Sequence, residues 1–241
     1  MPRSRLVVLI AAVLVVIGVG GFVVYDQVLR GDSAAALALP TTSVGAGAGA
    51  SAAPAASFDG IVAGTWTVGS GSVAGYRVRE QLASLPAESD AVGRTSGVTG
   101  SITIETSSAT TTLTAGSLSV DTTTITSDKS MRDNRLRSEG LQTDAYPTAT
   151  FKLTKPVEVP AAALTGTASP MTLTGELTLH GVTKTVDIPA QARLVGGGIQ
   201  VAGSLGFALS DYGMTAPNIG GFVVSIADTG TLEFLVDFTK A

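Results

Sequence analysis

A strict two-residue alternation of apolar and polar side chains dominates the second half of the chain. Apolar or small residues alternate with Thr, Ser, Lys or Glu in the segments 98–105, 149–153 and 171–179, and they recur at every second position in 201–209 and 232–238. This period places successive side chains on opposite faces of a strand, so that each strand has one apolar and one wet face. Turn-prone residues such as His180-Gly181 separate the segments. The pattern predicts about eight half-buried antiparallel strands, typical of a sandwich or a closed barrel.

Small residues recur on the apolar faces of these predicted strands. They include Gly100, Ala149, Gly175 and Gly203. An eight-stranded soluble barrel has an interior that is either filled by side chains or large enough for one small ligand. We expect the small residues to leave volume inside, which favours a hollow barrel. A filled barrel with an ordinary packed core is the alternative.

The first thirty residues are of a different kind. Leu6–Val24 carries no charge and has about the length of roughly 20 residues that a helix needs to cross a bilayer. Arg3 and Arg5 precede it, which predicts an amino terminus on the cytoplasmic side. Residues 1–30 are therefore predicted to be a cytoplasmic amino terminus and a single-pass membrane anchor, with the remainder extracytoplasmic. The alternative is a cleaved signal and a secreted protein, with Ala34 and Ala36 as a late cleavage site.

Residues 31–57 form a second region, rich in Ala, Gly, Ser and Pro. From Ser33 to Ser57 it contains no charge and few bulky apolar side chains, too few to offset the entropy cost of ordering. The composition predicts a flexible linker. The remaining residues, 58–241, have the length of a single domain.

Composition excludes several classes of function. The net charge of −4 predicts no broad basic surface, so no nucleic-acid partner is expected. With no Cys and one His, His180, neither disulfides nor a transition-metal site is expected. We interpret His180 as a hairpin-turn residue. The chain lacks a G-x-S-x-G elbow, which argues against a serine hydrolase. The sequence therefore predicts a protein that is not an enzyme and has no cofactor.

One charged segment interrupts the β pattern. Between residues 128 and 139 lie seven charged side chains, although only 14% of the whole chain is charged. Ser127 is a suitable helix N-cap, and Asp128 and Arg132 have the spacing of an ion pair on one helix face. Gly140 can end the helix. The segment predicts a short amphipathic helix between two strands, at one end of the barrel.

Three motifs occur in an order that resembles a known family. S-D-x-x-x-R-D-x-x-L begins at Ser127, D-x-Y-P-x-A-x-F at Asp144 and G-x-L-T-L-H-G-V-T-K at Gly175. Together they resemble the YceI-like, polyisoprenoid-binding, lipocalin-like proteins, over nearly all of residues 64–241. The Ala- and Gly-rich composition is similar to that of actinobacterial members. The resemblance implies an all-β, eight-stranded antiparallel lipocalin-like barrel with a short helix. It also implies an apolar tunnel for a long isoprenoid chain, export from the cytoplasm, and binding rather than catalysis.

Candidate binding residues follow from the motifs and the apolar strand faces. The proposed tunnel-lining residues are Tyr76, Val78, Met131, Leu136, Phe151, Leu177 and Phe207. Arg132 and Arg135 are candidates for the polar head group, because the planar guanidinium suits a quinone carbonyl or a pyrophosphate. The alternative is that both arginines pair with neighbouring carboxylates.

Two functions remain open from the sequence. The first is a membrane-tethered, extracytoplasmic module that binds an isoprenoid lipid, either a quinone or a polyprenyl phosphate, for carriage, storage or sensing. The second is a structural or stress-related interaction domain with a filled barrel core. The expected partners are the isoprenoid lipid and, through Leu6–Val24, the membrane.

Overall fold

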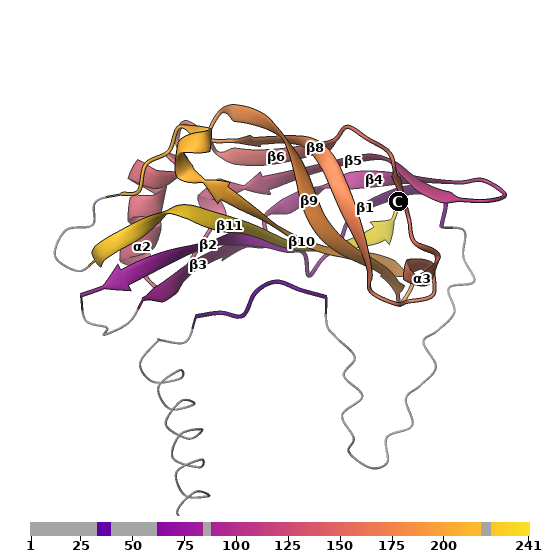
Figure 1. Cartoon of the computed structure of the whole chain (residues 1–241), viewed down its shortest axis with the longest axis horizontal. Coiled ribbons are helices and arrows are strands. Elements are labelled where there is room, and N and C mark those ends of the chain that lie inside the picture. The colour runs from indigo at the N-terminus through magenta and orange to yellow at the C-terminus, as the bar shows by residue number, and fades with distance from the viewer. Residues whose placement is uncertain (1–32, 40–61, 84–87, 218–222) are drawn as a thin grey trace, which may run out of the picture.

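The computed structural model describes residues 33–39, 62–83, 88–217 and 223–241 (Figure 1). The predicted span Leu6–Val24 and most of the predicted linker lie outside the described residues. Within the described ranges, no helix has both the length and the apolar character needed to cross a membrane.

Eight strands close into an antiparallel ring in the part of the chain that the structure describes. Their order around the ring is β1, β4, β5, β6, β8, β9, β10 and β11, and β1 closes it by pairing with both β4 and β11. The predicted eight-stranded barrel is therefore confirmed. The ring strands are β1 (Gly64–Val68), β4 (Val98–Thr106), β5 (Thr111–Asp121), β6 (Thr148–Leu153), β8 (Ser169–Leu179), β9 (Val182–Val195), β10 (Gly198–Ala208) and β11 (Val223–Lys240).

The sequence alternation corresponds to the two sides of the barrel wall. On β8, Leu173, Leu177 and Leu179 are buried, whereas Thr172 and Glu176, on the other face, are exposed. Because side chains alternate across a strand, one apolar residue in two is enough to line the interior.

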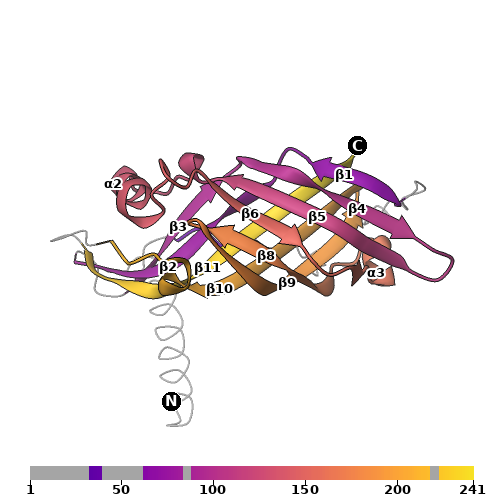
Figure 2. The ribbon, with the colours of Figure 1, turned by 90° about the horizontal axis from the view of Figure 1, so that it is seen from above.

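Two further strands extend the wall at one end of the barrel. β2 (Val73–Leu82) pairs with most of β11, and β3 (Ser89–Thr95) pairs with β2. β1 pairs only with the carboxyl end of β11. A bridge between Arg94 and Thr126 connects β3 to the segment after β5. The two ends of the barrel are thus closed by different strands, β1 at one and the β2–β3 hairpin at the other (Figure 2). The short β7 (Val157–Glu158) pairs with β5.

Short helices lie at the two ends. α2 (Ser130–Arg135) continues into a π-helical turn, η3 (Leu136–Gly140), and covers the end next to β2 and β3. α3 (Ala161–Leu164) lies at the opposite end (Figure 2). The predicted short helix between two strands is confirmed, including its end at Gly140. Two single 3-10 turns, η2 (Thr122–Thr124) and η4 (Leu209–Tyr212), follow β5 and β10.

The start of the helix differs from the prediction. Ser127 is not the N-cap; Lys129 takes that position, without a side-chain capping bond. Instead, the backbone N–H and the hydroxyl of Ser127 donate to the Asp133 carboxylate at 2.9 and 2.6 Å. Asp133 is buried, and its charge-assisted bonds hold the preceding loop against the helix.

The predicted flexible linker is also corrected in part. Seven of its residues, Ser33–Leu39, form an extended segment outside the barrel that we call the strap; it is the indigo segment beneath β2 and β3 in Figure 1. Leu39 is buried, and several strap backbone groups hydrogen bond to barrel side chains. Composition does not indicate this segment, because composition reflects side chains, whereas the strap is held mainly through its backbone.

Candidate functional site

A cavity of about 230 Å³ lies inside the barrel, with an almost entirely apolar lining. The lining extends from Leu136 and Leu141 beside α2 to Ile102 and Leu113. Beyond these, a packed core around the fully buried Trp66 fills the end near α3. The main cavity therefore lies towards the α2 end, whereas a smaller cavity of about 30 Å³ lies within the more tightly packed end near α3. An apolar cavity of this kind does not hold ordered water well and favours an apolar occupant.

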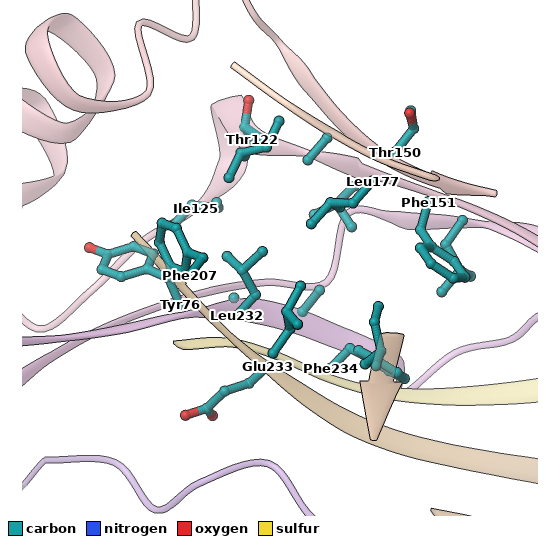
Figure 3. A pocket seen from close by; sticks show the side chains of 18 of the residues that line it. Tyr76, Thr122, Ile125, Thr150, Phe151, Leu177, Phe207, Leu232, Glu233 and Phe234 are labelled. Atoms are coloured by element: carbon teal, nitrogen blue, oxygen red, sulfur yellow. The ribbon is translucent and has the colours of Figure 1, made fainter. Parts of the chain in front are cut away.

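Most of the predicted tunnel residues line this cavity. They are Tyr76, Val78, Leu136, Phe151, Leu177 and Phe207. Figure 3 shows Leu177 and Phe151 along one side of the lining and Tyr76 with Phe207 towards one end. Whether these residues contact a ligand stays a prediction, but their placement around one cavity is observed.

Met131 and Arg135 lie elsewhere. Met131 is 56% exposed, and neither residue lines the cavity. Arg135 forms an ion pair with Glu139 on the helix surface. Arg132, between them in sequence, does line the cavity. The sequence predicted the helix but not its rotation about its axis, which decides which residues face inward.

The inward glycines do not leave empty space in the expected way. A Cβ atom at Gly175 would lie 2.5 Å from the Phe151 ring, and one at Gly203 would lie 2.6 Å from the Phe234 ring. An aromatic ring therefore occupies the space over each of these glycines. The two rings lie against the barrel wall, directly over the glycines. The middle of the barrel therefore stays open beside them. The prediction of a hollow interior was right, but for Gly175 and Gly203 the proposed reason was wrong.

This packing predicts a position-specific cost for a single methyl group. Gly203→Ala should lower the free energy of unfolding by about 1–3 kcal/mol, the usual cost of overpacking, because the added Cβ meets the Phe234 ring and the Pro189 carbonyl. Gly206→Ala on the same strand is the control, since nothing lies within 4 Å of its Cβ position. Urea denaturation of both variants provides the measurement. Equal stabilities would contradict the packing account.

One end of the cavity is polar. Arg132 donates hydrogen bonds to Glu80 and to Asp128, and also to the Ser127 hydroxyl at 3.2 Å. The side chains of Glu80 and Arg132 are only 3% and 11% exposed, so this is a buried ion pair. Both residues line the cavity together with Tyr76.

Two donors at this polar end have no hydrogen-bond partner among the residues that the structure describes. They are the Tyr76 hydroxyl and the Arg132 Nε–H, and both atoms are buried. A buried donor without an acceptor costs about 1–3 kcal/mol, so native structures rarely leave one unsatisfied. Figure 3 places the Tyr76 hydroxyl at one end of the lining, past Phe207. The arrangement suits a ligand that has a long apolar part and a hydrogen-bond acceptor at one end.

Burial and charge fix the protonation of these donors. Burial raises the pKa of Tyr76 to about 12, with smaller upward contributions from Asp133, Glu80 and Asp128 that Arg132 opposes. Burial alone would lower the pKa of Arg132, but the hydrogen bonds and charges of Glu80 and Asp128 outweigh it and raise that pKa. At neutral pH the phenol is therefore a neutral donor and the guanidinium is charged.

The Tyr76 shift predicts a late alkaline titration. Because the pKa of Tyr76 is about 12 in the folded state and about 10 in the unfolded chain, deprotonation favours unfolding. The neutral phenol's contribution to stability is complete below pH 10 and is lost between pH 10 and 12. Tyrosinate absorbance at 295 nm should therefore contain a component with a midpoint near pH 12 that Tyr76→Phe removes. A component near pH 10 that is lost in this variant would contradict the burial of the phenol.

The motif residues that carried the family resemblance form a structural cluster at the same end. His180 lies in the β8–β9 turn with φ +51°, as predicted for a turn residue, and its Nδ1 is 3.0 Å from the Tyr212 carbonyl oxygen. Its ring lies 4.3 Å from the Tyr146 ring. Lys184 pairs with Asp211 at 2.6 Å. These contacts join the β8–β9 hairpin to the segment before β6 and to η4, which gives these residues of the second and third motifs a structural role.

The sequence reasoning missed Glu80. A period-two signal was available, because Glu80 follows Tyr76 and Val78 on the inward face of β2. A carboxylate at an inward position predicts a buried partner. Its partner, Arg132, lies 52 residues away in the sequence, so the alternation alone did not identify the pair.

Comparison with a solved structure supports this architecture. A polyisoprenoid binding domain from Saccharophagus degradans has a TM-score of 0.56 at 20% identity, covering 74% of this chain and 99% of that one, and so shares the fold. BcnA from Burkholderia cenocepacia has a TM-score of 0.49 at 18% identity, covering 72% of this chain and 95% of that one.

Sequence comparisons give the family. A UPF0312 protein from Vibrio parahaemolyticus is 41% identical over 80 residues, a stretch that spans 33% of this chain and 38% of that protein. A sequence model of the YceI-like domain matches residues 67–238, which is most of the chain. The chain therefore belongs to the YceI-like domain family.

Proposed function

We propose that this protein binds an isoprenoid lipid, with the apolar chain in the barrel cavity and the head group at the polar end. The observation that carries the proposal is the apolar cavity of about 230 Å³, which ends at two buried donors that no described residue satisfies. Family membership and the polyisoprenoid-binding relative of the same fold support it. Burial of the lipid chain supplies the driving force, about 25 cal/mol per Å² before ordering costs. The cavity argues against the alternative of a filled structural barrel.

The charges at the polar end favour a neutral head group. Arg132 already pairs with Glu80 and Asp128, and Asp133 is buried nearby. A phosphate would bring further negative charge to a site that has more carboxylates than guanidinium groups. A quinone carbonyl brings only an acceptor, which the Tyr76 hydroxyl and the Arg132 Nε–H can satisfy. We therefore favour an isoprenoid quinone over a polyprenyl phosphate, and Arg132 over the surface-paired Arg135 as its contact.

The cellular setting of the proposal rests on the amino-terminal sequence. With Leu6–Val24 as a membrane span, the barrel is extracytoplasmic and stays near a bilayer that contains such lipids. In this proposal the protein binds the lipid without catalysing a reaction on it, and serves to carry, store or sense the lipid.

A competition experiment tests the head-group assignment. The full chain is mixed with equal amounts of menaquinone and polyprenyl phosphate in detergent, and native mass spectrometry measures the bound ratio. Quinone should predominate, and Tyr76→Phe should weaken quinone binding roughly threefold to tenfold, the value of one hydrogen bond. Tyr146→Phe, outside the cavity lining, is the control. Preferential binding of the phosphate would overturn the neutral-head-group assignment but leave isoprenoid binding intact.

A further inference from the structure

The outer surface beneath the strap contains an unusual set of charges. Arg77 on β2, Asp90 and Arg94 on β3, and Glu233 on β11 pair with one another across three adjacent strands. Arg77 lies 3.0 Å from Asp90 and 2.8 Å from Glu233, and Arg94 lies 3.5 Å from Glu233. Asp90 also pairs with the half-exposed Arg79 at 3.0 Å, so three guanidinium groups surround the two carboxylates.

The burial of Glu233 indicates that this outer surface is covered by another part of the protein. Its side chain points away from the cavity in Figure 3, towards the outside of the barrel, yet it is only 4% exposed. A carboxylate on the outer face of a strand is normally solvated, and burying it costs several kcal/mol unless charges and hydrogen bonds compensate. Arg77 and Arg94 supply the charges, and the Leu37 N–H of the strap donates to Glu233 at 3.0 Å.

The remaining contacts also use the strap backbone. Arg77 donates to the Ala34 carbonyl at 2.6 Å, and Arg94 donates to the Ala35 carbonyl. Each arginine therefore joins the charge cluster to the strap. Since these bonds go to backbone groups, an alanine-rich sequence is sufficient for them.

Two side chains at the ends of the strap add specificity. The Ser33 hydroxyl donates to the Asp90 carbonyl at 3.0 Å and accepts from the Asp90 N–H at 3.2 Å. Leu39 is buried at the other end, whereas Ala36 and Ala38 between them are exposed. The strap thus bonds to the surface through its backbone and the Ser33 hydroxyl, and its Leu39 is buried at the other end.

We propose that the outer face of β2, β3 and β11 is a peptide-docking site whose occupant is the chain's own Ser33–Leu39, and that docking shortens the connection to the amino-terminal segment. Only eight residues separate Val24 from Ser33, whereas thirty-nine separate Val24 from Gly64. At about 3.5 Å per extended residue, the maximum reach falls from roughly 140 Å to roughly 30 Å when the strap is docked. With Leu6–Val24 as a membrane span, docking keeps the barrel close to the bilayer.

Hydrogen exchange of the full chain tests the docking. In the native protein, the peptide that contains Leu37 should exchange at least tenfold more slowly than an unstructured chain. The double variant Ser33→Ala with Leu39→Ala, which changes only the strap, should lose this protection, while β8 and β9 stay protected. Ala38→Ser is the matched control, since that side chain is exposed, and should behave as the native protein does. Exchange of the native strap at the unstructured rate, or full protection in the double variant, would overturn the proposal.

Distance measurements test whether the barrel's own strap is the occupant. The chain has no Cys, so spin labels can be attached at Ala36→Cys in the strap and Thr185→Cys on β9, both exposed positions. A narrow distance distribution that persists on dilution supports docking within one molecule. A distribution as broad as that of the Ser33→Ala, Leu39→Ala variant contradicts it, as does one that is narrow only at high concentration.

Discussion

Leu177→Trp is expected to abolish isoprenoid binding while the barrel stays folded. Leu177 lies on β8 opposite Phe151, and both side chains line the cavity. An indole at this position would occupy the lumen that the proposal gives to the lipid chain. Each CH₂ group excluded forfeits about 0.8 kcal/mol, so excluding five carbons weakens binding by about 4 kcal/mol, or roughly a thousandfold.

The fold should tolerate this substitution. Overpacking typically costs about 1–3 kcal/mol against a total stability of about 5–15 kcal/mol, and here the cavity offers room. Glu176→Trp is the control, because it adds the same indole to the exposed side of the same strand. Native mass spectrometry gives the lipid occupancy, and circular dichroism confirms folding. Unchanged lipid binding in folded Leu177→Trp would remove Leu177 from the tunnel; Phe207→Trp tests the cavity at a second position.

Arg132→Ala is expected to be the most destabilising single substitution at the polar end. It removes the partner of the buried Glu80 carboxylate, together with the bonds to Asp128 and Ser127. Leaving one member of a buried ion pair uncompensated typically costs about 3–5 kcal/mol. In urea denaturation, Arg132→Ala should therefore have a free energy of unfolding about 3–5 kcal/mol lower than that of the native protein, with the midpoint at a lower urea concentration.

A matched arginine provides the control for this prediction. Arg135→Ala, three residues along, breaks an ion pair whose members are 47% and 40% exposed, and pairs of that kind contribute about 0–1 kcal/mol. Replacing both Glu80 and Arg132 by Leu should recover much of the lost stability, because the buried Glu80 carboxylate is then no longer left without its partner. Equal effects of Arg132→Ala and Arg135→Ala would contradict the buried pair.

The strands and the barrel were predictable because burial of one face of a strand produces a two-residue alternation of apolar and polar residues in the sequence. The alternation in 171–179 and 201–209 reappears as the inward and outward faces of β8 and β10. Most predicted tunnel residues follow from the same rule, since an inward position in a hollow barrel is a position on the cavity. The pairing of Arg132 with Asp128, which lies just before the helix, was likewise indicated by their spacing.

The features that were not predicted depend on contacts between residues far apart in the sequence, which no local sequence pattern indicates. Glu80 meets Arg132 only because the fold brings β2 under α2. Met131 points outward because the rotation of a six-residue helix is set by the barrel beneath it, and so few residues carry too weak a periodicity to define it. Amino-acid composition does not indicate the strap, because Arg77 and Arg94 bind its backbone carbonyl groups, which every residue possesses.

The central claim is that the barrel holds an isoprenoid lipid. The most direct test is to express the full chain in cells that make isoprenoid quinones, purify it gently, and weigh it by native mass spectrometry before and after organic extraction. We predict a bound species at one lipid per barrel, identified in the extract as a prenyl quinone and absent from Leu177→Trp. A folded wild-type protein that carries no prenyl lipid, and acquires none when mixed with quinone-containing membranes, would contradict the account.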